Sequence, residues 1–255
     1  MASEEPASRD QAWARTAPAR VARELVVRGV FGSIVATYSR RDVFGLEQLE
    51  DIATPVIFVA NHCSHVDTPV LLLSLPAARR RRTVVAAAAD YFYGSPLLAG
   101  AVSLAFGTVP LERRGRGGRA EATHIGRLLG DGWNLVMFAE GTRSRDGRLG
   151  RMRSGAAVLA AEHGLPIVPV HISGTREAMP VGSNWMVRPE DGGRWDRHAL
   201  SVSFGPPIEV GPGDHPGEAM ACVRGFMQTC GAETAEDADP GPRVPRPALD
   251  AAASL

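Results

Sequence analysis

With 255 residues, 28 basic and 28 acidic side chains, the chain carries a formal net charge of zero. This length suits one domain with short appendages, and the balanced charge gives no indication of a nucleic-acid partner. Its three cysteines show no paired spacing, which favours a reducing compartment without a disulfide framework. Charges and Pro interrupt the first residues, so we expect no signal peptide, and no apolar run reaches the ~18 residues of a spanning helix.

Residues 1–12 are polar and predict a disordered N-terminus, and residues 13–40 predict a helix. Arg residues occupy its front, whereas residues 25–38 are apolar nearly all round. Such a helix must be buried against protein or lipid. The basic flanks are typical of a membrane-associating helix, and packing on the domain is the alternative.

The centre of the chain alternates predicted strands with predicted helices. The expected strands are 55–60, 83–89, 107–111, 133–138, 167–172 and 200–205, and the expected helices are 68–75, 119–129, 155–163 and 218–230. This order predicts an α/β fold with a mainly parallel or mixed central sheet flanked by helices, over residues 41–230. Pro169 inside a strand indicates a sheet edge or the wall of a site. Residues 231–255 are rich in Ala, Pro and acidic residues and predict a disordered tail.

Residues 61–67, Asn-His-Cys-Ser-His-Val-Asp, directly follow the first predicted central strand. A neutral imidazole accepts a proton near neutral pH, and a carboxylate on its other nitrogen fixes the tautomer. His62 and Asp67 are therefore candidates for a base that activates a hydroxyl. Asp67 before Thr68-Pro69 is also a good helix start, and both roles are compatible.

Two later segments indicate a phosphate site. Residues 138–144, Phe-Ala-Glu-Gly-Thr-Arg-Ser, follow a predicted strand and combine backbone N–H groups with an Arg fork, which suits phosphate. Residues 107–113 form another strand that ends in Arg113. Considered alone, a solvated turn is the default interpretation of the first segment, and a surface charge is the favoured interpretation of Arg113.

Together, and in this order, the segments resemble the glycerolipid acyltransferase family of the lysophosphatidic acid acyltransferase type. Four family blocks, N-H-x-S-x-x-D, G-x-[IV]-x-[IVL]-x-R, F-P-E-G-T-R-S and an apolar-Pro-apolar strand, match residues 61–67, 107–113, 138–144 and 168–170. The likeness extends over residues 40–210. Order and spacing of all four blocks make it specific.

The resemblance implies that His62 deprotonates the acceptor hydroxyl, which attacks the thioester of acyl-CoA or acyl carrier protein, while Asp67 orients His62. It implies support for this segment from Asn61 and Ser64, and no metal or organic cofactor. The acceptor phosphate would be held by Arg113, Glu140, Gly141, Thr142 and Arg143. Glu140 is itself an anion, so we expect it to orient Arg side chains or the turn.

Two departures from the family leave the acceptor open. Ala139 replaces the usual proline of the third block, which we expect to loosen that turn. The chain reads Ala-Ala-Ala-Ala-Asp at 86–90, where some members carry a Lys. Lysophosphatidic acid is the first candidate acceptor. Glycerol 3-phosphate, another lysophospholipid and an amino-acid-linked lipid are alternatives.

Three other classes of protein compete with this interpretation. The His and Cys residues of 61–67 suggest a metal-dependent hydrolase, but their spacing does not match the usual zinc patterns. Cys63 or Ser64 as a nucleophile suggests a covalent hydrolase, but the chain has no G-x-S-x-G elbow. A lipid- or partner-binding protein with a decayed site is disfavoured because His62, Asp67, Glu140 and Arg143 are all present.

The implied partners are a lysophospholipid acceptor, an acyl thioester donor and a membrane surface, with acyl carrier protein as a further candidate. We therefore expect a peripheral or monotopic protein on the cytoplasmic face of the cell membrane. The run Arg79–Arg82 lies between apolar segments, so contact with anionic lipid is a hypothesis for it.

Overall fold

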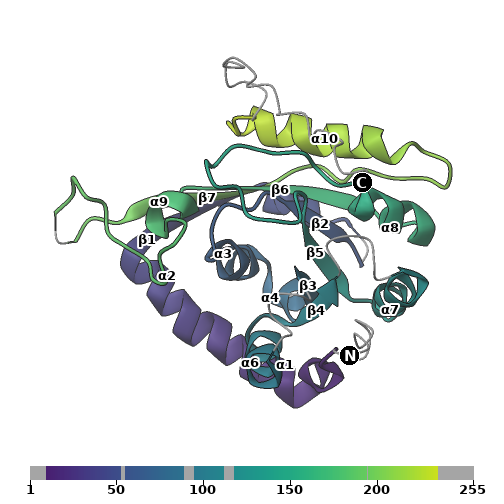
Figure 1. Cartoon of the computed structure of the whole chain (residues 1–255), viewed down its shortest axis with the longest axis horizontal. Helices are drawn as coiled ribbons and strands as arrows, with labels where there is room; N and C mark the ends of the chain where they lie inside the picture. The colour runs from purple at the N-terminus through teal and green to yellow at the C-terminus, as the bar shows by residue number, and fades with distance from the viewer. Residues whose placement is uncertain (1–9, 53–54, 89–94, 112–117, 194, 235–255) are drawn as a thin grey trace, which may run out of the picture.

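The computed structural model describes residues 10–52, 55–88, 95–111, 118–193 and 195–234. At its centre lies a seven-stranded sheet (Figure 1) in the order β1-β7-β6-β2-β5-β3-β4. The strands are β1 (Ser39–Phe44), β2 (Ile57–Ala60), β3 (Thr83–Ala88), β4 (Thr108–Leu111), β5 (Asn134–Phe138), β6 (Ile167–Ser173) and β7 (His198–Phe204). Five neighbouring strands, β6, β2, β5, β3 and β4, are parallel, whereas β7 is antiparallel to β6, and β1 is parallel to β7. The predicted α/β fold with a mixed sheet is confirmed.

Helices cover both faces of the sheet. The helical segments are η2 (Ala12–Arg15), α1 (Ala17–Leu25), η3 (Val26–Phe31), α2 (Gly32–Tyr38), η4 (Leu46–Leu49), α3 (Asp67–Ser74), α4 (Ala77–Arg80), α6 (Pro96–Phe106), α7 (Gly118–Gly130), α8 (Gly155–His163), α9 (Thr175–Ala178) and α10 (Pro216–Thr229). One apolar core joins the sheet to α7, α8 and α10, and the other joins it to η3, α2 and α3. Because side chains alternate along a strand, β2 supplies Ile57 and Val59 to the first core and Phe58 and Ala60 to the second.

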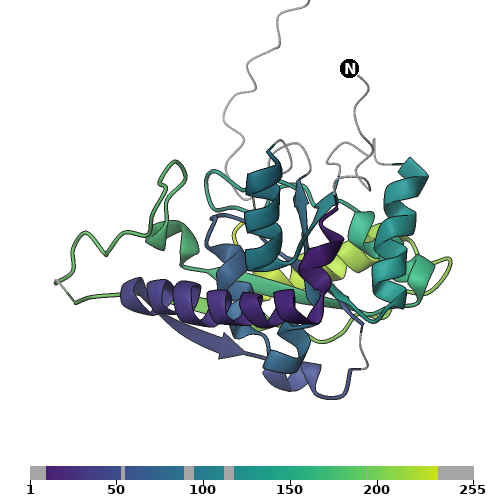
Figure 2. The same cartoon turned by 90° about the horizontal axis from the view of Figure 1, so that it is seen from below.

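The N-terminal segment α1–η3–α2 runs as one long rod along the molecule (Figure 2). It packs on the domain by one side: the buried guanidinium of Arg23 donates to three main-chain carbonyls, those of Ala14, Ser103 and Leu104. Glu24 forms an ion pair with Arg80 of α4. The opposite side of the rod leaves Val21 and Leu25 63% and 69% exposed. Within the described parts of the chain, no helix is long and apolar enough to cross a membrane.

The structure corrects the predicted ends of the N-terminal helix and of the tail. The helix predicted over 13–40 ends at Tyr38, and Ser39 begins the edge strand β1, which the sequence analysis did not assign. The tail predicted from residue 231 is ordered at its start, because the N–H of Leu149 donates to the carbonyl of Glu233 at 2.7 Å. Residues 1–9 and 235–255, also predicted to be disordered, lie outside the described residues.

Pro169 does not lie at a sheet edge, so the first of the two alternatives predicted for it is wrong. Its strand β6 has β7 on one side and β2 on the other. A Cβ on Gly205 would come within 2.7 Å of Pro169 Cγ and of the ring of Phe226 in α10. The proline therefore fills the interface between the sheet and α10, beside a residue without a side chain that directly follows β7.

The run Arg79–Arg82 is engaged with the protein over its first half. Arg79 donates to the carbonyls of Leu49 and Ile52, both at 2.6 Å, and Arg80 is buried beside Glu24. Only the exposed Arg81 and Arg82 remain for the contact with anionic lipid that we hypothesised for the whole run.

Candidate active site

The predicted base lies at the carboxyl edge of the parallel strands. Residue 61 follows β2 directly, and the turn 139–144 follows the neighbouring strand β5. Because parallel strands end at the same edge, segments almost 80 residues apart in the chain lie side by side here. This edge is the common place for ligand sites in open α/β sheets.

His62 and Asp67 form a hydrogen-bonded pair. His62 Nδ1 lies 2.8 Å from Asp67 Oδ2, and the carboxylate is fully buried. The same Oδ2 accepts the backbone N–H groups of Cys63 and Ser64, each at 2.8 Å. Because Oδ2 acts as the acceptor for two backbone N–H groups, it also acts as the acceptor in its bond with His62. Nδ1 of His62 therefore carries the ring proton, and Nε2 is the basic nitrogen.

The ring of His62 is held from a second side by Phe138. The two rings stack with centroids 3.9 Å apart and an angle of 18° between their planes. Phe138 is the last residue of β5 and also lines the large cavity of the site. Stacking against the ring, together with the bond to Asp67, fixes the plane of the imidazole.

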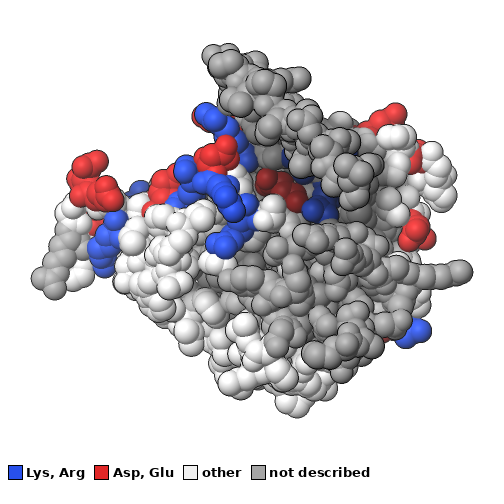
Figure 3. Space-filling model, in the orientation of Figure 1, with Lys and Arg blue, Asp and Glu red and all other residues white. Residues whose placement is uncertain are grey.

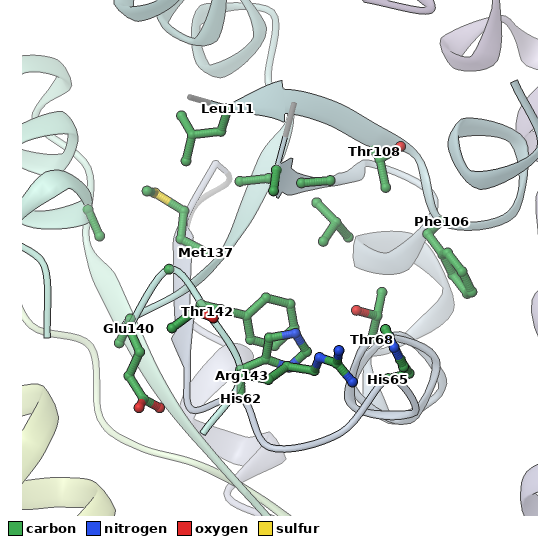
Figure 4. Close-up of a pocket in the computed structure, with 18 of the residues that line it drawn as sticks. His62, His65, Thr68, Phe106, Thr108, Leu111, Met137, Glu140, Thr142 and Arg143 are labelled. Carbon is green, nitrogen blue, oxygen red and sulfur yellow. The ribbon is translucent and has the colours of Figure 1, made fainter. Parts of the chain in front are cut away.

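Glu140 and Ser144 hold the main chain of His62. The N–H of Ser144 donates to the carbonyl of His62 at 2.7 Å. The Glu140 carboxylate accepts the N–H of His62 and, at 3.0 Å, that of Gly150, and burial raises the pKa of this carboxyl. In Figure 4 the carboxylate points away from the His62 ring. Residues 138–144 thus hold in place both the main chain of His62 and the turn that they form themselves.

Ala139 does not loosen this turn, contrary to our expectation. Its backbone N–H donates to the carbonyl of Ala60 at 2.8 Å, a bond that proline cannot make. Its carbonyl accepts the N–H of Arg153 at 2.8 Å. The turn is therefore joined to β2 and to the segment before α8.

Arginines surround the turn Gly141-Thr142. Arg143, Arg151 and Arg153 all line the cavity with these two residues. A Cβ on Gly141, whose φ is +69°, would lie 2.7 Å from Arg153 Nε, so the arginine packs directly over the glycine. On the face drawn in Figure 3, Arg side chains gather over the connection between β5 and α8. This arrangement suits an anion. Arg113 lies outside the described residues.

A cavity of about 1330 Å³ opens beside His62. Figure 4 shows His65, just before α3, and Thr68, in the first turn of α3, projecting into it, with Arg143 reaching toward them across the His62 ring. Most of the remaining lining is apolar and includes Phe31, Val85, Phe106, Leu111, Met137 and Leu159. The site therefore combines the predicted base, a cationic end and an apolar volume large enough for a hydrocarbon chain.

Asn61 and Ser64, the predicted support residues, join the segment 61–67 to β6 and to the end of α9. The amide of Asn61 donates to the carbonyl of Ile172 and accepts its N–H, both at 2.8 Å. The hydroxyl of Ser64 donates to the carbonyl of Met179 at 2.8 Å. Ser64 is thus occupied by a structural bond, which does not favour it as a nucleophile.

The rival chemistries find little support in this geometry. Burial, followed by the charge of Asp67, raises the pKa of Cys63 to about 12, so the thiol stays protonated. In the described part of the chain, no three His, Cys, Asp or Glu side chains are grouped to hold a metal ion.

Three residues with roles at the site escaped the sequence analysis: Phe138, Arg153 and Thr175. Phe138 matches the first position of the family's third block, but the sequence does not indicate that its ring stacks on His62. Arg153 belongs to a visible Arg cluster, but its position over Gly141 depends on the path of the loop 141–153. The hydroxyl of Thr175 donates to Asp67 Oδ1 at 2.5 Å. The two residues are 108 positions apart in the chain, so no local sequence pattern indicates this contact.

The fold and the site define a class: α/β proteins in which a histidine, hydrogen-bonded to a buried aspartate, faces a largely apolar cavity with a cationic end. The sequence model of the Acyltransferase family matches residues 40–173. This chain belongs to the Acyltransferase family, as the sequence motifs predicted.

Individual relatives agree with this assignment. The 1-acyl-sn-glycerol-3-phosphate acyltransferase BAT2, chloroplastic, of Brassica napus is 34% identical over 157 residues, 60% of this chain and 43% of the relative. Its counterpart LPAT1, chloroplastic, of Arabidopsis thaliana is 36% identical over 145 residues, 56% and 38% of the two chains. The chain thus spans less than half the length of these relatives.

A solved structure shares the fold. The crystal structure of the 1-acyl-sn-glycerophosphate (LPA) acyltransferase PlsC from Thermotoga maritima superposes with a TM-score of 0.59 at 22% identity. The match covers 87% of this chain and 83% of that one.

Proposed function

We propose that this protein transfers a fatty acyl group from a thioester to the free hydroxyl of 1-acyl-sn-glycerol 3-phosphate, which gives phosphatidic acid. The observation that carries the proposal is the His62–Asp67 pair facing a cavity that is cationic at one end and apolar elsewhere. An acceptor with a phosphate and an acyl chain needs both surroundings. The names of the relatives BAT2 and LPAT1 point to the same acceptor.

In the proposed reaction, Nε2 of His62 takes the proton of the acceptor hydroxyl while its oxygen attacks the thioester carbonyl carbon. Asp67 stabilises the imidazolium through Nδ1. The tetrahedral intermediate collapses with cleavage of the carbon–sulfur bond. The thiolate then takes the proton from His62, so the products are an ester and a thiol, and His62 is neutral again.

The acceptor phosphate binds at the arginine-lined turn in this proposal. Arg143, Arg151 and Arg153 supply the positive charge, and the backbone of residues 142 and 143 supplies N–H donors, since the N–H of Gly141 is bonded to the carbonyl of Phe138. Arg113, which the family motif assigns to the same role, remains a prediction. Glu140 acts through the main chain of His62 and does not touch the phosphate.

The donor is acyl-CoA or an acyl carrier protein, and both carry the same thioester. The reaction as written needs no metal or organic cofactor. For a water-insoluble acceptor we propose a peripheral or monotopic position on a membrane surface, at the cytoplasmic face of the cell membrane. The exposed apolar side of α1 supports this position.

The test is acyl transfer from radiolabelled palmitoyl-CoA and oleoyl-CoA to lysophosphatidic acid, glycerol 3-phosphate, other lysophospholipids and a lyso-aminolipid. Phosphatidic acid should form with the wild type, and the rate should fall by about 10³-fold or more in His62→Ala and most of the way in Asp67→Asn. His163→Ala, an exposed histidine on α8, is the matched control.

Other results of this assay would change a particular part of the proposal. Transfer only to an acceptor without phosphate would keep the roles of His62 and Asp67 and reject the anion site. Full activity of His62→Ala would reject the mechanism. If CoA thioesters fail, the assay is repeated with acyl carrier protein, and thioester hydrolysis without transfer would favour a hydrolase.

A further inference from the structure

The two oxygens of the buried Asp67 carboxylate have different surroundings. Oδ2 accepts three N–H donors, from the His62 ring and from the main chain of Cys63 and Ser64, each at 2.8 Å. Oδ1 accepts the hydroxyl of Thr175 at 2.5 Å, and the only other contact recorded for it among the described residues is Cys63 Sγ at 4.0 Å. Both Asp67 and Thr175 are fully buried. Without Thr175, Oδ1 would be a buried anionic oxygen without a short hydrogen bond, which is costly.

Thr175 belongs to a segment that is built to face the catalytic turn. It begins α9 directly after Gly174, whose φ of +77° turns the chain at the end of β6. A Cβ at Gly174 would lie 2.1 Å from the carbonyl oxygen of Ala199, so only glycine fits this turn. Three residues earlier, Ile172 is bonded twice to Asn61, and Met179 past the end of α9 accepts from Ser64. The segment 172–179 is thus joined to residues 61–67 at both ends, with Thr175 between them.

The direction of the hydrogen bonds around Thr175 follows from its partners. The carboxylate can only accept, so the single hydroxyl proton of Thr175 points to Asp67 Oδ1. Cys63 Sγ lies 3.3 Å from Thr175 Oγ1 and 4.0 Å from Asp67 Oδ1, so the thiol can only donate in these contacts, and Thr175 Oγ1 is the nearer acceptor. The resulting chain runs from the Cys63 thiol through the Thr175 hydroxyl to Oδ1. Each member strengthens the bond that follows it.

We infer that Thr175 is a positioning residue for the reaction: it sets the rotation of the Asp67 carboxylate so that Oδ2 stays aligned with Nδ1 of His62. The terminal torsion of an aspartate is soft, so a carboxylate whose donors all meet one oxygen can still pivot about that oxygen. A hydrogen bond to the second oxygen removes that freedom. The inference rests on the proposed function for its kinetic consequence, whereas the geometry of the His62–Asp67 bond can be measured without substrate.

The kinetic test uses Thr175→Val and Thr175→Ala, which remove the hydroxyl, and Thr175→Ser, which keeps it. We expect kcat to fall about 10- to 100-fold in the first two, the range for a small misplacement of a catalytic group, with both KM values changed less than about twofold. Thr175→Ser should restore kcat to within about threefold of the wild type. Thr83→Val is the matched control, since Thr83 is equally buried and its hydroxyl donates to the carbonyl of Arg79 at 2.7 Å.

The second measurement is the proton NMR signal of His62 Nδ1–H, identified by its loss in His62→Gln. We expect the low-field signal in the wild type, Thr175→Ser and Thr83→Val, and a broadened or upfield-shifted signal in folded Thr175→Val or Thr175→Ala. An unchanged signal together with unchanged kcat in these two variants would overturn the inference, as would equal losses in Thr175→Ser. If the wild type transfers no acyl group, the proposed function fails, and the NMR result still decides the role of Thr175.

Discussion

Arg143 is the residue for which the proposed phosphate site makes the sharpest prediction. It lines the cavity next to Gly141 and Thr142, and Figure 4 shows its side chain extending across the His62 ring. Arg143→Ala should raise the KM for lysophosphatidic acid by about 10- to 100-fold, because a charge-assisted bond to phosphate contributes about 1.5–3 kcal/mol. The KM for the acyl donor should change less than about threefold. Steady-state kinetics with each substrate varied in turn measures both values.

The control for Arg143 lies two residues away. Arg145 is exposed, belongs to the same Arg cluster and does not line the cavity, so Arg145→Ala should leave both KM values near those of the wild type. Equal increases in the two KM values for Arg143→Ala would assign this arginine to a general electrostatic role. An unchanged acceptor KM would contradict phosphate binding.

At the residue scale, the sequence identified the parts of the site that are local in the chain. His62 and Asp67 stand five residues apart after one strand, so their pairing follows from a single turn. Thr175 reaches Asp67 only because β6 lies next to β2, and Phe138 stacks on His62 only because β5 lies on the other side. These neighbours depend on the strand order, which no local pattern contains.

At the scale of elements, the attachment of α1 to the domain yields a pH-dependent prediction. Glu24 of α1 bonds Arg80 through both carboxylate oxygens, and this bond lowers the pKa of Glu24. Since the folded-state pKa lies below the unfolded one, the pair stabilises the protein above about pH 4.3 and less as the pH falls through the lowered pKa. Glu24→Gln should therefore lower the free energy of unfolding by about 2 kcal/mol at pH 7. The difference should shrink toward zero in acid.

Chemical denaturation of the wild type and Glu24→Gln between pH 3 and pH 8 measures this difference. Glu47→Gln, at an exposed position in η4, serves as control and should show little difference at any pH. A constant difference over the whole range would show that the carboxylate charge of Glu24 does not act through Arg80.

Strand β1 and helix α6 could not be predicted because their residues show no clear strand or helix pattern. The edge strand β1 carries Arg40, Arg41 and Asp42 and directly continues a helix, so neither its composition nor a turn marks its start. Helix α6 lies in an apolar stretch without clear periodicity, and short apolar runs fit a buried helix and a strand equally well. The strands between them were predicted because they are continuous apolar runs that are buried on both faces.

At the scale of the whole molecule, alternation of strands and helices indicated a mainly parallel sheet but not the reversal at its far end. Strands β1 and β7 run opposite to the other five strands. They extend the sheet by two strands at the edge beside the end of α2. That side also carries the connection from α9 to β7, whose Trp185 donates to the hydroxyl of Tyr38 at 3.1 Å and lines the cavity. The apolar end of the cavity is therefore built jointly by the N-terminal rod and a late segment of the chain.

The exposed side of this rod is the surface on which the proposed membrane attachment depends. Val21, Leu25 and Val30 are each more than half exposed, and Arg28 on the same segment is also exposed. Val21→Ser combined with Leu25→Ser removes on the order of 2–3 kcal/mol of apolar transfer free energy, which corresponds to about 30- to 150-fold weaker partitioning into vesicles. Flotation with vesicles that contain anionic lipid measures the change.

Two comparisons separate membrane contact from loss of folding. Phe44→Ser changes an equally exposed apolar residue on the edge strand β1 and should leave flotation unchanged. Because an Arg near an anionic surface contributes about 1 kcal/mol, Arg28→Ser should weaken binding to anionic vesicles several-fold and leave binding to neutral vesicles unaltered. If the Val21/Leu25 variant is folded and floats like the wild type, this side of α1 does not contact the membrane, and the acceptor must reach the cavity from another surface.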